Sequence, residues 1–313
     1  MRYVFLFSLL WCAQFSMNAH AQAPGTRSYQ SLELPLSAHS AALGGENISI
    51  IADDLPLALH NPALLSSVSD KTFSLGYMNY MADIQALHAG YSQVMGARST
   101  LGGAMTLMDY GMFSRRDDQD QDLGTFTAKD INFMLLYAYN LTDYWSGGVA
   151  AKAIYRRYDV FSSLALATDL ALNYYNAEQD FSFSIAARNL GGEVQHFEDQ
   201  TEKLPVNFMI GATKKLAHAP FAMSATMSRL QDWDEGFVRH LSLGVDAYLS
   251  KAIYAAIGYN FRRASELKVG DSAHGAGWTF GAGLHTKRIK ADAAYGRYHV
   301  AGSSILLNFA YSF

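Results

Sequence analysis

Cysteine is almost absent from this chain. The one cysteine among its 313 residues, Cys12, lies in an apolar stretch close to the N-terminus. Acylation of this cysteine, as in a lipoprotein, needs a small residue before it, and Trp11 stands there instead. The remainder of the chain has no thiol, which excludes disulfide bonds and thiolate-bound metal ions from any account of it.

Charged residues and long apolar runs are also scarce. Asp, Glu, Lys and Arg make up 17% of the chain, against about 25% in soluble domains. The net charge is −4 and no basic tract is present, which excludes nucleic acid as a partner. Hydrophobic residues nevertheless reach 50%, yet no run after the N-terminal stretch approaches the roughly 20 residues of a spanning helix. Such a chain is either a large soluble β-protein or a membrane barrel whose alternate residues face lipid.

The first 21 residues have the three parts of a secretory signal peptide. Arg2 gives a short positive region, Tyr3 to Phe15 form the apolar region, and Ala19-His20-Ala21 supplies the small-x-small cleavage pattern. We therefore expect residues 1–21 to be removed on export and the mature chain to begin near Gln22.

Beyond the N-terminal fifth of the chain, apolar residues alternate with small or polar ones. In the last segment Ile305, Leu307 and Phe309 lie on one face, while Asn308 and Ala310 lie on the other. This period of two indicates β-strands. An apolar face opposite a small or polar face suits the wall of a barrel that separates lipid from a lumen. The pattern predicts an all-β fold, a 14-stranded antiparallel transmembrane outer-membrane barrel over residues 71–313. The expected strands are 72–80, 84–95, 99–110, 127–140, 144–158, 163–176, 180–189, 205–217, 219–231, 237–250, 251–263, 274–286, 288–299 and 302–313.

The lengths of the connections predict how the barrel is oriented. Counting from the first strand, the long connections are the third (Gly111 to Phe126), the seventh (Leu190 to Leu204) and the eleventh (Arg263 to Ala273), all odd, whereas the even ones are tight turns. Outer-membrane barrels place short turns in the periplasm and long loops outside. We therefore expect an integral outer-membrane protein of a bacterial cell whose C-terminus, Phe313, is periplasmic.

Residues 22–70 precede the first strand and have a different character. Small residues are dense from Ser40 to Gly45, and Asn61-Pro62 marks a turn because proline restricts the residue before it to extended geometry. This segment is either a plug inside the lumen, for which 14 strands leave room, or a periplasmic tail. The small residues favour the plug.

Three short motifs in this segment carry a resemblance to a known family. Ala42-Leu43-Gly44-Gly45, Ala52-Asp53-Asp54 and His60-Asn61-Pro62-Ala63-Leu64 resemble the N-terminal signature of the FadL-related barrels of Bacteroidetes, which include PorV and PorQ of the type IX secretion system. The overall length and Glu33 to Ala38 look most like the PorQ branch. His60 stands where PorV-type chains have Trp or Tyr. The motifs cover about 25 residues.

The resemblance implies a non-enzymatic role in the complex that attaches secreted cargo to lipopolysaccharide. A PorQ-like barrel would anchor a soluble surface protein of the PorZ type, which works with a sortase-like subunit and other attachment-complex subunits. The alternatives are a FadL-like transporter of hydrophobic small molecules, with a lumenal pocket and a lateral opening, and a PorV-like cargo shuttle. Outer-membrane lipid and lipopolysaccharide are expected partners in each case.

No catalytic residue, cofactor site or metal site is predicted. The ten histidines include no close ligand pair, and no Gly-x-Ser-x-Gly motif occurs. Asp118, Asp120 and Asp122 have calcium-loop spacing, but Leu123 occupies the position that needs glycine, so a solvated loop is favoured over a divalent-ion site.

Two sets of residues are nonetheless candidates for function. The plug motif is expected to consist of Gly44, Gly45, Asp53, Asp54, Asn61 and Pro62. The candidate partner loops contain Arg115, Arg116, Asp118, Asp120, Asp122, Glu193, Asp199, Arg263 and Glu266. By strand parity, four further charged residues point into the lumen, where burial requires pairing and where they are expected to tie the plug to the wall: Lys152, Asp169, Arg188 and Asp246.

Overall fold

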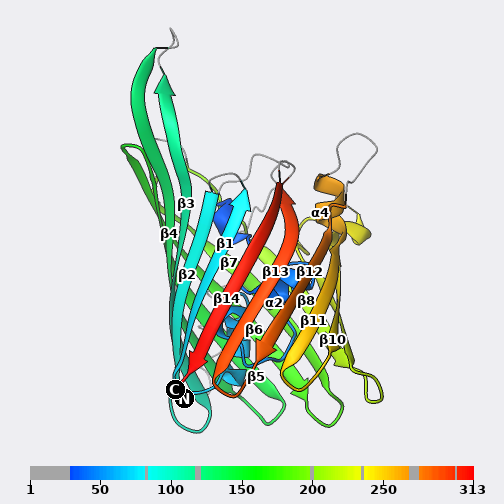
Figure 1. The fold of residues 1–313 in the computed structure, drawn as a ribbon. Helices are drawn as coiled ribbons and strands as arrows, with labels where there is room; N and C mark the ends of the chain where they lie inside the picture. The colour runs from blue at the N-terminus through cyan, green and yellow to red at the C-terminus, as the bar shows by residue number, and fades with distance from the viewer. Residues whose placement is uncertain are drawn as a thin grey trace.

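Fourteen antiparallel strands close into a barrel, as the alternation predicts (Figure 1). The computed structural model describes residues 29–81, 84–116, 121–197, 201–233, 236–267, 275–299 and 302–313. Each strand pairs with its sequence neighbours, and β1 pairs with β14 to close the wall. The strands are β1 (Thr72–Met81), β2 (Ile84–Val94), β3 (Ser99–Arg116), β4 (Asp122–Asn140), β5 (Trp145–Tyr158), β6 (Phe161–Asn176), β7 (Phe181–Gln195), β8 (Asn207–Lys215), β9 (Phe221–Met227), β10 (Leu241–Tyr248), β11 (Ile253–Asn260), β12 (Trp278–His285), β13 (Ile289–His299) and β14 (Gly302–Ser312).

The two faces of the wall divide as expected for a barrel in lipid. On β14, Ile305, Leu307 and Phe309 are 44–50% exposed on the outside, whereas Leu306 and Ala310 are buried on the inside. An outward apolar surface of this extent is stable only against hydrocarbon. No helix among the described residues is long and apolar enough to cross a membrane.

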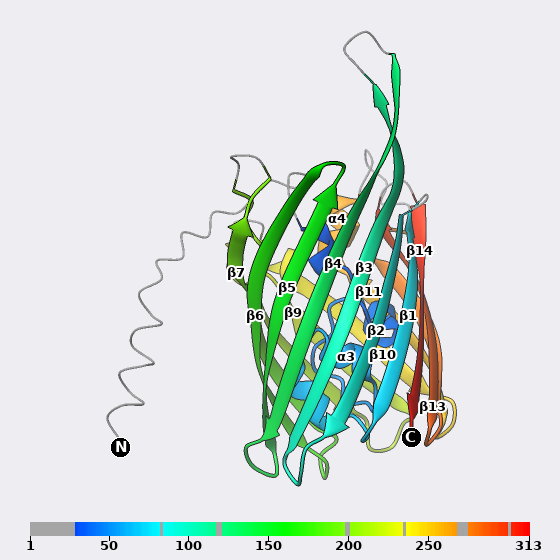
Figure 2. The same ribbon diagram turned by 90° about the vertical axis from the view of Figure 1, so that its left-hand side faces the viewer.

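The prediction of a loop from Gly111 to Phe126 is wrong, because β-strand continues into this segment from both sides. β3 and β4 continue as a two-stranded ribbon, with Met112 opposite Thr127 and Phe113 opposite Phe126, and this ribbon rises beyond the rest of the rim (Figure 2). β7 likewise continues to Gln195, past the predicted end. Strand pairing between two neighbours satisfies backbone hydrogen bonds without a buried face, so the apolar alternation used for prediction stops before the strands do.

The strand expected to continue to residue 263 is also wrong, because β11 ends at Asn260. There Asn260 caps a short helix, α4 (Phe261–Glu266), by accepting a hydrogen bond from the Arg263 amide through its side-chain oxygen. Asparagine is a favoured helix N-cap. The chain thus turns over the lumen as a helix instead of extending the wall, as the position of α4 at the rim in Figure 1 shows.

Residues 29–70 lie inside the barrel and fill it, which confirms the plug expectation over the tail. Figure 2 shows the blue helical turns enclosed by the wall. They are η2 (Gln30–Leu32), α2 (Ala38–Ala42), α3 (Leu55–Ala58) and η3 (Pro62–Ser67). α2 packs against β11 to β14, and η3 packs against β3 to β6. The buried core therefore sits between this N-terminal segment and the inner face of the wall.

The two ends of the barrel differ. At the short-turn end the strands are joined by tight connections, and the Phe313 amide donates to the Lys71 carbonyl at 3.3 Å. At the opposite, loop end lie the β3–β4 ribbon and α4 (Figure 1).

Candidate functional site

The Gly-Gly turn of the plug motif is bound to the wall by hydrogen bonds. Gly44 and Gly45 have φ values of 95° and 85°, a region that favours glycine. The Gly44 amide donates to Thr279 Oγ1 at 3.0 Å, and Asn260 Nδ2 donates to the Gly44 carbonyl at 3.0 Å. Gly258 on β11 lets the plug backbone approach the wall, because a Cβ there would overlap Leu43 and Gly44. The motif is therefore a docking contact between plug and wall.

Of the other plug-motif residues, Asn61 and Pro62 shape the segment itself, and Asp53 ties it to the wall. Asn61 caps η3 by accepting from the Ala63 amide at 3.0 Å, and its Nδ2 donates to the Ile48 carbonyl at 2.6 Å. Pro62 occupies the first turn of η3, where its missing amide hydrogen is not needed. Asp53 lies 2.6 Å from Lys290 Nζ on β13.

A buried cluster of titratable groups forms around α2. His39 Nε2 lies 2.9 Å from Asp246 Oδ1, and the His39 ring stacks on Tyr254 at 4.1 Å. Tyr254 donates to Asp292, which also contacts His285; both distances are 2.7 Å. Asp54 completes the cluster, and Ser37 Oγ donates to it at 3.0 Å. Parity identified Asp246 as an inward residue, but no sequence signal pointed to its partner His39. Among the described residues, no three or more His, Cys, Asp or Glu side chains are placed so that they could hold a metal ion.

We expect this cluster to make attachment of the plug depend on pH. Burial and the nearby Asp292 charge raise the pKa of Asp54 to about 7. Burial opposes protonation of His39, but Asp246 outweighs it and raises the His39 pKa. In both groups the folded pKa exceeds the unfolded one, so their contribution is complete below the unfolded pKa and is lost as pH rises through the folded pKa.

We expect amide hydrogen-exchange protection over residues 37–59 to fall at least about tenfold between pH 5 and pH 8, after correction for the intrinsic exchange rate. The pKa of Asp53 is shifted in the opposite direction. Burial is outweighed there by hydrogen bonds from Lys290 and Ser69, which lower its pKa, so its loss lies below this window. Asp54→Asn is the matched control and should remove most of the pH dependence. Unchanged protection from pH 5 to pH 8 in the unsubstituted protein would contradict the assignment.

The start of the described chain is anchored separately, at the loop end. Tyr29 donates to Glu193, Ser31 Oγ donates to Asp130 at 2.8 Å, and Arg188 donates to the Leu32 carbonyl at 3.2 Å. Glu33 pairs with Arg229. The Arg156 guanidinium lies 4.2 Å from the centroid of the Tyr29 ring, within cation–π range. These contacts fix residues 29–33 to β4, β5 and β7 and to Arg229.

Between these anchors and α2 lies a small internal cavity. Leu32, Leu34 and Leu36 form one side, and Met78 and Leu306 form part of the wall opposite them. Its remaining lining includes Ala86 and Met108 and the polar residues His88, Thr106, Asp130 and Asn132. The free space is about 20 Å³, room for one water molecule. No motif in the sequence predicted this site, although Leu32, Leu34 and Leu36 alternate with period two and so indicate an extended segment with one apolar face.

The candidate partner-loop residues lie in different environments. Arg115 and Arg116 lie on β3 in the exposed ribbon, where Arg115 pairs with Asp159. The Glu193 side chain is buried under Tyr29, and Arg263 stacks on Tyr298 at 3.9 Å, so a partner reaches neither without displacing these rings. Glu266 is exposed and lies 3.8 Å from Arg262. Asp118, Asp120, Asp199 and the Asp122 side chain lie outside the described residues.

The charged lumen residues predicted by parity are buried and paired. Lys152 lies 2.5 Å from Asp169, and Arg188 lies 4.0 Å from the same carboxylate. Asp246 and Arg188 contact the plug, whereas Lys152 and Asp169 join one strand of the wall to another. Of these four residues, therefore, only Asp246 and Arg188 tie the plug to the wall.

Comparison with known proteins identifies the fold. No family model and no curated protein matches the chain. Among solved structures, the toluene transporter TodX of Pseudomonas putida has a TM-score of 0.61 at 11% identity, and TbuX of Ralstonia pickettii has 0.59 at 13%; each match covers 90% of this chain and 99% of the other. The monoaromatic hydrocarbon channel CymD gives 0.60 at 12%, covering 90% and 98%. The chain therefore has the fold of the FadL-type outer-membrane barrels.

Proposed function

We propose that this barrel binds small hydrophobic molecules in its lumen and passes them across the outer membrane. The observation that carries this proposal is the internal cavity between residues 31–36 and the inner wall. Its surface is formed mainly by leucine and methionine side chains, with a smaller set of polar residues among its lining. A mostly apolar pocket with a few placed polar groups is the usual form of a small-molecule site.

The polar residues in the cavity lining restrict the chemistry of the ligand further. Asn132 Oδ1 is buried and has no hydrogen-bond partner among the described residues, and it lies at the cavity with His88 and Thr106. An unsatisfied acceptor of this kind costs free energy that a ligand hydroxyl would recover. The cavity thus suits an apolar molecule that carries at most one small polar group.

Binding requires residues 31–36 to move, because the present cavity holds only one water. Their anchors at Tyr29, Ser31 and Glu33 lie near the loop end. By contrast, Ser37 caps α2, and the Ala38 amide donates to Asn308 on β14. Withdrawal of the chain before Ser37 would enlarge the cavity while the rest of the plug stays docked.

The related folds support the same class of ligand. TodX and TbuX are described as toluene transporters and CymD as a monoaromatic hydrocarbon channel, and this chain matches almost their whole length. In the orientation we propose, long loops lie outside the cell and the short-turn end, with Phe313, faces the periplasm.

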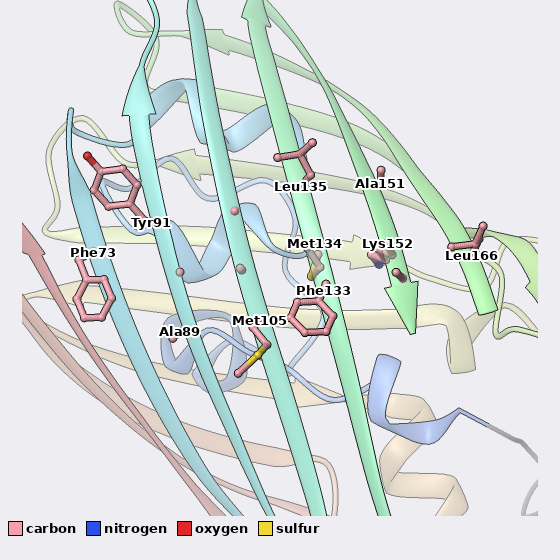
Figure 3. A pocket seen from close by; sticks show the side chains of 14 residues that line it. Phe73, Ala89, Tyr91, Met105, Phe133, Met134, Leu135, Ala151, Lys152 and Leu166 are labelled. Carbon is pink, nitrogen blue, oxygen red and sulfur yellow. The ribbon is translucent and has the colours of Figure 1, made fainter. Parts of the chain in front are cut away.

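Ala86→Phe tests the cavity directly. Ala86 lines it from β2, so a phenyl ring there should fill the space and weaken binding of the neutral apolar probe N-phenyl-1-naphthylamine by about tenfold or more, measured by fluorescence titration of the purified barrel. Ala89→Phe is the matched control, because Ala89 lies on the same strand but lines the outer face (Figure 3). Leu34→Ala should strengthen binding of larger probes. Equal affinity in both phenylalanine variants would refute a lumenal site.

A second candidate function is the anchoring of a soluble surface protein in a type IX attachment complex. The observation that favours it is the β3–β4 ribbon, which stands beyond the rim and exposes Met112, Phe113 and Leu123. Apolar side chains that rise clear of the lipid-facing wall are typical of a protein contact. Co-purification of a soluble surface protein from native membranes, lost when the ribbon is shortened to a tight turn, is the corresponding test.

A further inference from the structure

The charges at the short-turn end are unevenly distributed around the rim. The cations lie at five consecutive positions around this rim. Four are the β8–β9, β10–β11, β12–β13 and β2–β3 turns, and the fifth is the point where the end of β14 meets the start of β1. The cations are Lys71, Arg98, Lys214, Lys215, Lys251, Lys287 and Arg288, accompanied by Asp70 and the terminal carboxylate. The remaining two turns carry Asp143, Glu178 and Asp180 and no cation. One side of the rim is therefore cationic.

Several of these cations have no protein partner. Lys71, Arg98, Lys251, Lys287 and Arg288 are exposed, and within the described part of the chain none of their side chains forms an ion pair or hydrogen bond. Exposed apolar side chains stand beside them: Phe313 is 74% exposed next to Lys71, Leu249 is 70% exposed near Lys251, and Met95 is 53% exposed near Arg98. An apolar anchor beside a cation is the arrangement that suits a membrane interface.

A hollow in the lipid-facing wall begins at Phe73, two residues along the chain from Lys71. It has a volume of about 660 Å³ and spans β1 to β6 (Figure 3). Phe73 and Tyr91, which pair across β1 and β2 close to the rim, stand at one end, and Met105 and Phe133 stand further along. Gly103 lies on its floor, where the nearest atom that a Cβ would meet is the Met134 carbonyl oxygen, at 3.8 Å. The hollow is apolar, and Lys71 and Arg98 lie on the rim, just before β1 and β3, the first and third of the strands that it spans.

We infer that this hollow and the adjoining cations bind an anionic phospholipid, with the headgroup phosphate between Lys71 and Arg98 and an acyl chain along Phe73, Gly103 and Met105. The charge identifies the headgroup, since each cation near an anionic surface contributes about 1 kcal/mol of attraction, or roughly fivefold in affinity. The hollow identifies the other part of the ligand as an acyl chain, because an apolar recess that opens to hydrocarbon gains dispersion contacts only from a group that fills it. The site requires neither the proposed transport nor the lumenal cavity.

Lipid retention by the purified full-length barrel tests this inference. In detergent, native mass spectrometry with added phosphatidylglycerol or phosphatidylcholine should show about tenfold tighter retention of phosphatidylglycerol. The double variant K71Q/R98Q should abolish this preference, while Gly103→Phe, which fills the hollow, should reduce retention of both lipids. The matched control K203Q/R239Q removes the same charge from exposed residues at the loop end and should leave the preference unchanged.

Three results would overturn the site. They are equal retention of the two lipids by the unsubstituted protein, a preference that persists in K71Q/R98Q, and a preference lost equally in K203Q/R239Q. Loss of retention in Gly103→Phe counts only if the variant keeps its β-sheet circular dichroism. Displacement of the lipid by an acidic soluble protein would also reject a lipid site in favour of a protein contact.

Discussion

Gly148→Leu should expel the N-terminal segment from the lumen and leave the barrel closed around an open pore. Gly148 lies on β5 and faces inward, where a Cβ would overlap the backbone of Pro62 and Ala63 in η3. Backbone atoms held by the Asn61 cap cannot give way as a side-chain end can. Overpacking of about 3 kcal/mol corresponds to roughly a 100-fold rise in the displaced state. Limited proteolysis within residues 29–70 and single-barrel conductance measure it.

The neighbouring residue supplies the matched control for this experiment. Gly147 lies next to Gly148 on the same strand but faces outward, and its nearest neighbours are the side chains of Leu141 and Leu172 at 3.5 and 3.6 Å. Gly147→Leu changes the same strand by the same atoms, and these flexible side chains can shift. It should leave protease resistance and conductance as they are. Equal cleavage in the two variants would attribute the effect to a weakened strand and not to the plug.

Asp169→Asn should destabilise the whole barrel by about 3–5 kcal/mol, because it removes the one carboxylate between two buried cations. Lys152 Nζ lies 2.5 Å from Asp169 and Arg188 Nε lies 4.0 Å away, and all three side chains are at most 7% exposed. Asp169 also accepts from the Asn189 amide at 2.7 Å, where β7 has a φ of 58° and the β6–β7 register shifts. Equilibrium urea unfolding in detergent micelles gives the free energy of unfolding.

An exposed ion pair on the same barrel sets the scale for this loss. Asp109 lies 3.0 Å from Lys129, and these side chains are 34% and 44% exposed. Surface pairs of this kind contribute about 0–1 kcal/mol, so Asp109→Asn should lower the free energy of unfolding by no more than that. If the two substitutions cost the same, the buried network does not hold the β6–β7 bulge in place.

Together these contacts divide the N-terminal segment into two parts with different freedom. Residues after Ser37 dock through His39, Gly44 and Asp53 onto β10, β12 and β13, and η3 packs against β3 to β6. Residues 29–33 are anchored near the loop end, Leu36 accepts a hydrogen bond from Asn308 Nδ2 at 3.1 Å, and residues 31–36 cover the apolar cavity. In the transport we propose, ligand entry therefore requires release of the anchors at residues 29–33, and not removal of the plug.

The strands, their two faces and the plug could all be predicted from the order of the residues. Alternation is a local property, because successive side chains of a strand point to opposite faces whatever lies beyond them. Ile305 and Leu307 are therefore outside, and Asp169 and Asp246 inside, with no knowledge of their neighbours. The ribbon of β3 and β4 escaped prediction because pairing there continues without a buried face.

Which inward residues meet depends on how the barrel closes. His39 and Asp246 are 207 residues apart, and Leu34 reaches Met78 and Leu306 only because β1 and β14 pair to close the wall. Lys71, Arg98 and the hollow beside Phe73 likewise become one surface only when β1, β2 and β3 adopt their register. The alternation with period two determines which face of the wall a side chain takes. Barrel closure and strand register are set by pairing between distant strands, and they determine which residue lies opposite that side chain.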